Sequence, residues 1–276
     1  MARFVNISVL VVFLILFATE AYSQNLIIPE QDSLQDQFIA RIKQFNEFVD
    51  RFNYEADFND EIPDSSFKAL YPRERYLAHL FDRNLITGED NLLPPVNKFI
   101  NDVCIGEHFI YKYSPKIIAA ARTRILYEDL EGYITIYLNQ EIVGNDMVKW
   151  VILDVQGEVL DFMQSDTSHI RFISPSSNET NFINMRRALA DSLHLKDYAH
   201  GNYTYDQLSV FFYCIYKGII KVRQVEKITY HINDIPGWCL SVEEFNRSGY
   251  NSGWLISDIY ECELELPEFL EYIKME

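Results

Sequence analysis

The sequence has few basic residues for a chain of 276 residues. It contains 24 lysines and arginines against 41 aspartates and glutamates, so its formal net charge at pH 7 is −17. So acidic a surface repels phosphate backbones and anionic lipid headgroups. Because no cluster of lysine and arginine interrupts the acidic excess along the sequence, we expect neither nucleic acid nor an anionic membrane surface as a partner.

The sequence also lacks the motifs that mark metal, nucleotide and nucleophile sites. Its six histidines form neither a His-x-x-x-His nor a His-Glu-x-x-His pattern, and its glycines form no phosphate-binding loop. There is no Gly-x-Ser-x-Gly motif. The acidic run from Asp57 to Asp64 lacks the turn glycine and the distal glutamate of a calcium loop, so we interpret it as solvated. We therefore predict no metal and no cofactor.

One long apolar run stands at the start of the chain. It extends from Val9 to Phe17, follows Arg3 and precedes the small residues Ala21 and Ser23, a pattern typical of a secretory signal peptide. The alternative is an uncleaved anchor, but the run is short for a membrane-spanning helix. We predict that residues 1–23 are removed, that the mature chain is periplasmic or associated with the cell envelope, and that it does not insert into a membrane.

Only four cysteines are present, and all follow the predicted leader: Cys104, Cys214, Cys239 and Cys262. An exported protein can form disulfides. Cys239 and Cys262 flank a predicted hairpin and could face each other across neighbouring strands, although a count from the turn places them slightly out of register. This pair is the candidate disulfide, and buried free thiols are the alternative.

The periodicity of apolar residues changes from helical to alternating near residue 108. Residues 33–54 carry an apolar stripe at helical spacing, formed by Leu34, Phe38, Ile42, Phe45, Val49 and Phe52. Two further helices are expected in "PRERYLAHLFD" and "VNKFINDVCIG". Strands are expected in "FIYKYSP", "KIIAAARTRILYED", "GYITIYLNQEI" and "MVKWVILDV". Helices followed by an antiparallel sheet predict an α+β fold.

The second half of the chain repeats the order of the first. "YDQLSVFFYC" parallels "VNKFINDVC", "IIKVRQVEKITYH" parallels "IIAAARTRILYED", and Trp254 and Asp258 repeat Trp150 and Asp154. We predict two units, at residues 24–162 and 163–276. The second has no counterpart of the long first helix, so part of its sheet should be uncovered and packed tightly against the first unit.

The chain resembles a known superfamily in this arrangement. "FNYEADFNDEIPDSSFKALYPRERYLAHLFD" and "TIYLNQEIVGNDMVKWVILDV" resemble uncharacterised exported proteins of gut Bacteroidetes with tandem NTF2-like (cystatin-related) units. The resemblance implies helices packed on a highly curved antiparallel sheet in each unit. It also implies a cone whose mouth can bind small apolar ligands. It carries over no catalytic residues, because the superfamily hosts enzymes, binding modules and dimerisation domains alike.

Two aspartates are the candidate catalytic residues. In a regular strand, Asp154 shares a face with Trp150, and Asp258 shares a face with Trp254. A carboxylate beside apolar side chains can have a raised pKa and act as a general base. The alternative is that Asp154 and Asp258 form structural pairs with Arg75 and Arg186, and their recurrence in both halves favours this scaffold role.

Aromatic residues on the strands are the candidate ligand-binding residues, because they combine ring area with polar tips. They are Tyr111, Tyr133, Tyr137, Trp150, Tyr230 and Trp254; ordinary sheet packing is the alternative. We predict an exported, non-catalytic protein that binds a small ligand or an envelope protein, with homodimerisation as a further option. One alternative is an isomerase- or hydrolase-type enzyme with a buried carboxylate in one cone. Another is a structural partner in the cell envelope, joined through an exposed sheet face.

Overall fold

The structure is a computed structural model of the full chain. It describes residues 44–86, 92–144, 147–160, 190, 198–200, 206–248 and 251–275. All of these belong to one compact unit that begins at Lys43. The predicted signal peptide, the first part of the predicted long helix, the boundary between residues 162 and 163, and Arg186 lie outside the described residues.

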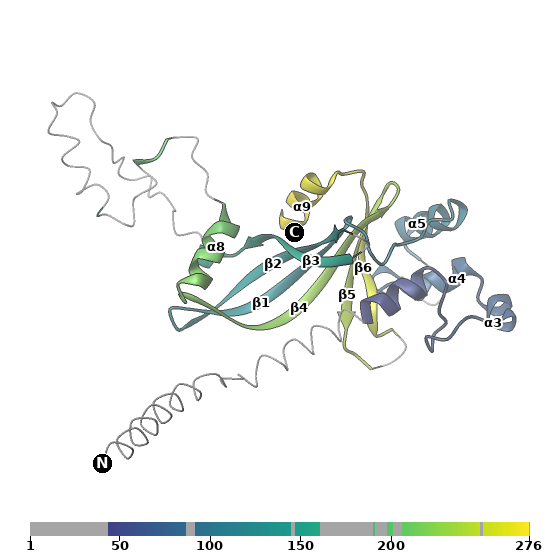
Figure 1. Cartoon of the computed structure of the whole chain (residues 1–276). Coiled ribbons are helices and arrows are strands. Elements are labelled where there is room, and N and C mark those ends of the chain that lie inside the picture. Colours follow the sequence, from purple (N-terminus) through teal and green to yellow (C-terminus); the bar gives the residue numbers. More distant parts are fainter. Residues whose placement is uncertain are drawn as a thin grey trace, which may run out of the picture. The chain divides into compact units, whose positions relative to one another are not determined.

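Six antiparallel strands form one open, curved sheet, so the chain has an α+β fold (Figure 1). The strands are β1 (Ile117–Tyr127), β2 (Leu130–Val143), β3 (Met147–Gln156), β4 (Ile220–Ile235), β5 (Trp238–Phe245) and β6 (Gly253–Glu261). Their order across the sheet is β3-β2-β1-β4-β5-β6. Because β1 pairs with β4, the strands of both halves of the chain share a single sheet.

Short helices surround this sheet. They are a helical segment over residues 44–52, α3 (Ser65–Leu70), α4 (Arg73–Ala78), η1 (Arg83–Leu85), α5 (Pro94–Ile105), η2 (Glu158–Leu160), α8 (Gln207–Tyr216) and α9 (Leu266–Met275). Their starts follow local rules. Pro94 opens α5, where a missing N–H costs nothing, and the Asp206 carboxylate accepts hydrogen bonds from the first turn of α8.

The register divides the sheet residues between two faces. Tyr230 lies opposite Ala119 on one side and Val242 on the other, whereas Tyr137 lies opposite Ala120. Neighbouring residues of a strand point to opposite faces. We call the two sides the Tyr230 face and the Tyr137 face.

The first-half helices pack on the Tyr230 face of the second-half strands. Phe45, from the helical segment over residues 44–52, stacks on Tyr230 with ring centroids 3.7 Å apart. Phe99 of α5 contacts Trp238 of β5 edge-on at 5.4 Å. The side chains of Phe45 and Phe99 are at most 1% exposed.

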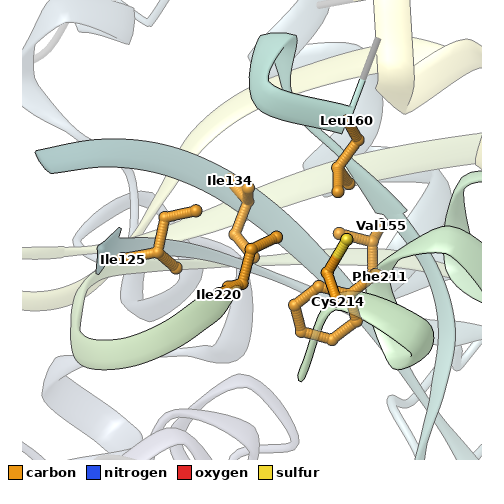
Figure 2. Close-up of a cluster of buried hydrophobic side chains, with 7 residues drawn as sticks. All are labelled: Ile125, Ile134, Val155, Leu160, Phe211, Cys214 and Ile220. Carbon is orange, nitrogen blue, oxygen red and sulfur yellow. The ribbon is translucent and has the colours of Figure 1, made fainter. Parts of the chain in front are cut away.

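The second-half helix α8 in turn packs on the first-half strands. Its residues Phe211 and Cys214 join a buried cluster with Ile125, Ile134 and Val155 of β1 to β3 (Figure 2). Leu160 and Ile220 complete the cluster. Each half of the chain therefore supplies helices that cover the other half's strands, which binds the halves together more closely than contact between two separate sheets would.

Helix α9 covers the Tyr137 face near the middle of the sheet. Phe269 and Ile273 of α9 pack against Ile118, Tyr137 and Cys239. A disulfide joins Cys239 of β5 to Cys262, just after β6, with a Cα–Cα distance of 5.7 Å. Cys104 and Cys214 are free thiols. The disulfide therefore holds the segment that leads into α9 against the sheet.

The hairpins at the two ends of the sheet have the same register. Tyr137 faces Asp154 in β2–β3 and Ser241 faces Asp258 in β5–β6, so adding 104 to both numbers of the first pair gives the second. The same shift relates every β2–β3 pair from Thr135–Gln156 to Glu141–Lys149 to a pair of β5–β6. Below, two positions are called equivalent when this shift relates them.

Candidate functional site

A β-bulge separates the candidate aspartate of β3 from the tryptophan. Asp154 pairs with Tyr137, but Ile152 pairs with the very next residue of β2, so Leu153 is an extra residue. Trp150 and Ile152 therefore lie on the Tyr230 face, whereas Asp154 lies on the Tyr137 face. The expected shared face of tryptophan and carboxylate does not form, because the alternation of a regular strand is interrupted between them.

The second hairpin repeats the bulge at the equivalent position. Asp258 pairs with Ser241 and Ile256 pairs with the next residue of β5, which leaves Ser257 as the extra residue. Each aspartate accepts a hydrogen bond from the backbone N–H of the following residue at 2.8 Å, Val155 in β3 and Ile259 in β6. Asp258 is exposed and Asp154 is half-buried. The two carboxylates are placed to stabilise the bulged backbone.

The ion partner of Asp154 is Lys274 of α9, at 2.8 Å, rather than Arg75. Arg75 is exposed, with its guanidinium 5.5 Å from the centre of the Tyr71 ring. Burial alone would lower the pKa of Lys274, but hydrogen bonds to Asp154 and to a glutamate of α9 raise that pKa above its ordinary value. Burial raises the pKa of Tyr137. Both groups stay protonated at neutral pH, and the ion pair of Lys274 with Asp154 holds α9 against β3.

The candidate ligand-binding aromatics do not converge on one site. Tyr133 and Tyr137 lie on the Tyr137 face, where Arg122 covers the Tyr133 ring at 4.9 Å. Tyr230 and Trp254 are buried on the opposite face, and Phe45 occupies the space in front of them. Trp150 is half-buried beside Tyr230, with ring centroids 6.2 Å apart. Tyr111, the last member of the set, is exposed and precedes the first strand.

A serine and a histidine meet on the Tyr137 face at hydrogen-bonding distance. The Ser241 hydroxyl lies 3.0 Å from Nδ1 of His231, and both side chains are buried. This is the spacing of a nucleophile and its base. Burial, with a smaller contribution from the charge of Lys227, lowers the pKa of His231 to about 4. Such a histidine is a weak base at neutral pH, and a buried hydroxyl is closed to substrate, so the pair is structural.

Basic residues also gather on the Tyr137 face, where the linear sequence shows no cluster. Arg122 and Arg124 of β1 lie beside Lys227 of β4. Arg124 forms an ion pair with Glu226 at 3.3 Å, and Lys227 forms one with Glu243 at 2.8 Å. Arg122 instead covers the Tyr133 ring. Because Arg124 and Lys227 are matched by carboxylates from neighbouring strands, the cluster consists largely of cross-strand ion pairs, each of which stabilises the fold only slightly.

The β6 edge of the sheet is sealed by the chain itself. Phe81 forms a parallel bridge with Ile256, so residues 80–82 add a short strand to β6. The buried carboxylate of Asp82 pairs with Arg247 in the loop between β5 and β6. Asn251 of the same loop donates a hydrogen bond to the Phe81 carbonyl at 2.8 Å. Sequence reasoning missed this seal because it depends on residues about 170 positions apart.

The opposite edge, β3, has no such seal within the described part of the chain. Ile152 is the residue equivalent to Ile256, and the described backbone provides no partner beyond β2 for it. Unpaired edge strands are sites at which other strands add. The open edge of β3 is therefore the first element of the candidate site.

The second element is a half-exposed apolar surface beside this edge, which we call the β3 patch. It comprises Leu138, Ile142, Val148, Trp150 and Ile152, all on the Tyr230 face. Ile142 is 59% exposed and the others are half-buried. The equivalents of Leu138, Trp150 and Ile152 on β5 and β6 are at most 2% exposed. We expected part of the second-half sheet to lack a helix of its own and to pack against the first unit. The first-half helices do cover β4 to β6, and the less buried surface lies on the first-half strands, where Ile152 also packs against the cluster that contains α8.

Comparison with protein-family models, with curated proteins and with solved structures found no match. Over the residues that the structure describes, no three histidine, cysteine or carboxylate side chains are close enough together to bind a metal ion. None of the described helices combines the length and the hydropathy that spanning a membrane requires. The β3 edge and the β3 patch therefore form the candidate functional site.

Proposed function

We propose that the mature chain is an exported, non-catalytic protein of the periplasm or cell envelope that binds another protein through the β3 edge and the β3 patch. We also infer that its halves are NTF2-like units, with the resemblance in sequence and the shared register of the two hairpins as support. The proposed partner is a protein of the cell envelope, the class of partner expected from the sequence. It would bind to the edge of the sheet and to the side chains beside that edge.

One observation carries the proposal: equivalent positions of the two hairpins differ in what covers them. Trp254 and Ile256 are buried beneath helices and beside residues 80–82, whereas Trp150 and Ile152 are half-buried beside an edge that no described residue seals. A contiguous apolar surface that is exposed to water is typical of an interaction site. Tryptophan is also among the residues that contribute most to binding energy at protein interfaces.

The enzyme alternative has less support from the described residues. It requires a buried carboxylate free to accept a proton. Asp258 is exposed, Asp154 is bound to Lys274, and the buried Asp82 is neutralised by Arg247. These three carboxylates all have structural partners or solvent around them, so we favour binding over catalysis.

Site-specific photo-cross-linking in the cells that produce the protein tests the proposal. A photoreactive phenylalanine analogue is placed at Trp150 or Val148 within the β3 patch. The matched control places it at Ile62, an apolar residue that is 87% exposed and lies in the loop before α3. We expect one discrete adduct from the two patch positions and none from Ile62.

The position dependence of the adduct decides the outcome. An equal yield at Ile62 would show that the protein adheres through any exposed apolar side chain. Absence of an adduct at both patch positions, with normal amounts of folded protein, would contradict partner binding at the β3 patch.

A further inference from the structure

The sealed edge shows how an added strand is held by this hairpin. The backbone N–H of Ile256 donates to the Leu80 carbonyl at 2.7 Å, and the Ile256 carbonyl accepts from the N–H of Asp82 at 2.8 Å. Phe81, between them, forms the bridge and directs its own N–H and carbonyl away from β6. Three residues of extended chain, parallel to β6, satisfy both outward backbone groups of one residue.

The shared register places the same two groups at the open edge of β3. Ile152 pairs with Leu138 as Ile256 pairs with Val242, and an identical bulge follows both residues. The N–H and carbonyl of Ile152 therefore point outward from β3, as those of Ile256 point outward from β6. Within the described part of the chain nothing bonds to them.

We propose that β3 accepts an extended segment of the partner protein as a parallel strand, hydrogen-bonded to both backbone groups of Ile152. This inference rests on the proposed function and specifies how the partner is bound. Addition of a peptide strand to an exposed sheet edge is a general mode of recognition, in which backbone bonds supply affinity and side-chain contacts supply specificity.

The surroundings of β3 define the chemistry of the segment. At the β6 edge, Asp82 of the added strand forms an ion pair with Arg247, which lies in the loop between β5 and β6. The corresponding loop between β2 and β3 reads Gly-Asn-Asp and contains no arginine. A carboxylate in the bound segment would therefore lack the arginine partner that Asp82 has at the β6 edge. The apolar side chains of Trp150 and Leu138 favour a segment of neutral, mostly apolar residues.

Short synthetic peptides test the inference without changing the protein. The probe is residues 78–84 of the chain itself with the substitutions D82N and R83L, which make it neutral and mostly apolar, acetylated and amidated at its ends. One derivative is N-methylated at position 82, whose N–H should donate to the Ile152 carbonyl. The matched control is N-methylated at position 81, whose N–H should point away from the edge.

Backbone amide shifts of the full mature chain are followed in a heteronuclear NMR spectrum during titration with each peptide. We expect the parent and the control to shift the amides of Val151, Ile152 and Leu153 with similar dissociation constants. The derivative methylated at position 82 should bind about tenfold more weakly, because one hydrogen bond of about 1–1.5 kcal/mol is lost.

Each other outcome contradicts the inference in a distinguishable way. Equal binding by the two methylated peptides would show contact with the β3 patch without strand addition, and would leave the proposed function standing if Trp150 still cross-links. If the Ile152 amide resists hydrogen exchange before peptide is added, the chain's own residues fill the edge. If the chemical shift of the Ile152 amide depends on protein concentration alone, a second copy of the protein occupies the β3 edge. No shift at all in β3 would also overturn the inference.

Discussion

Replacing the buried His231 should change how the stability of the protein depends on pH. In the unfolded chain a histidine has a pKa of about 6.5, whereas in the folded protein the pKa of His231 is about 4. Between these values the unfolded state binds more protons than the folded state, so stability falls as the pH is lowered. The loss begins near pH 6.5 and is complete near pH 4.

The size of the effect follows from the difference of about 2.5 pH units. Each unit corresponds to 1.36 kcal/mol, so His231 should account for about 3 kcal/mol of acid destabilisation. The substitution H231Q keeps a neutral polar group within reach of Ser241 and removes the titration. The variant should therefore lose about 3 kcal/mol less than the natural protein between pH 7 and pH 4.

Urea unfolding monitored by tryptophan fluorescence at several pH values measures this difference. The control is H79Q, which removes an exposed histidine at the C-terminal end of α4. If the stability difference between the natural protein and H231Q varies by less than about 1 kcal/mol from pH 7 to pH 4, the burial of an uncharged imidazole at this position is refuted.

Three further predictions follow from the contacts that secure the edges and α9. D82A should lower the free energy of unfolding by about 3–5 kcal/mol, because it leaves Arg247 without its buried partner. E261Q, which removes an exposed ion pair, should change the free energy of unfolding by at most about 1 kcal/mol, and urea titration compares the two variants. C262S should lower the free energy of unfolding by about 3 kcal/mol, because it removes a disulfide that joins residues 23 positions apart. Calorimetry under oxidising conditions measures the loss, and an unchanged melting temperature would contradict the prediction. K274M should speed hydrogen exchange in α9 but not in α5, and equal rates would show that the ion pair with β3 does not anchor the helix.

The regular elements of the fold could be predicted from local patterns. Alternating apolar residues placed β1, β2 and β3 within a few residues of their ends. The helical stripe is buried where the structure describes it, since Phe45, Val49 and Phe52 are at most 1% exposed. In each case the signal lies within one element, because burial of one face imposes its period on the sequence.

The segment "FIYKYSP" shows why a local pattern can mislead. It alternates like a strand, but the structure has no strand there. The side-chain amide of Asn53 instead bonds both backbone groups of Ile110, accepting at 2.9 Å and donating at 2.8 Å. Gln140 accepts a further bond from the N–H of Ser114. Side chains distant in sequence take the backbone bonds that a neighbouring strand would otherwise make.

The candidate site escaped prediction because it depends on pairing between distant strands. The bulges at Leu153 and Ser257 turn the two aspartates away from the tryptophans, and no residue type in the sequence announces a bulge. The difference between the two edges likewise appears only once residues 80–82 are known to bond to Ile256. The repetition in the sequence pairs Trp150 with Trp254 and Asp154 with Asp258, as the register of the two hairpins does. It could not show which tryptophan of the pair is buried beneath helices.

The central pairing of β1 with β4 explains how the fold can leave the β3 edge without a partner among the described residues and still be stable. That ladder extends from Ile117 to Tyr127, and helices from each half cross it to cover the strands of the other half. Neither half therefore has a complete core, and separating them would expose both the aromatic contacts of Phe45 with Tyr230 and the cluster around Phe211. Limited proteolysis should accordingly not yield two stable halves. An apolar edge on such a sheet is held in place by the rest of the core, which would lower the entropic cost of binding the proposed partner strand.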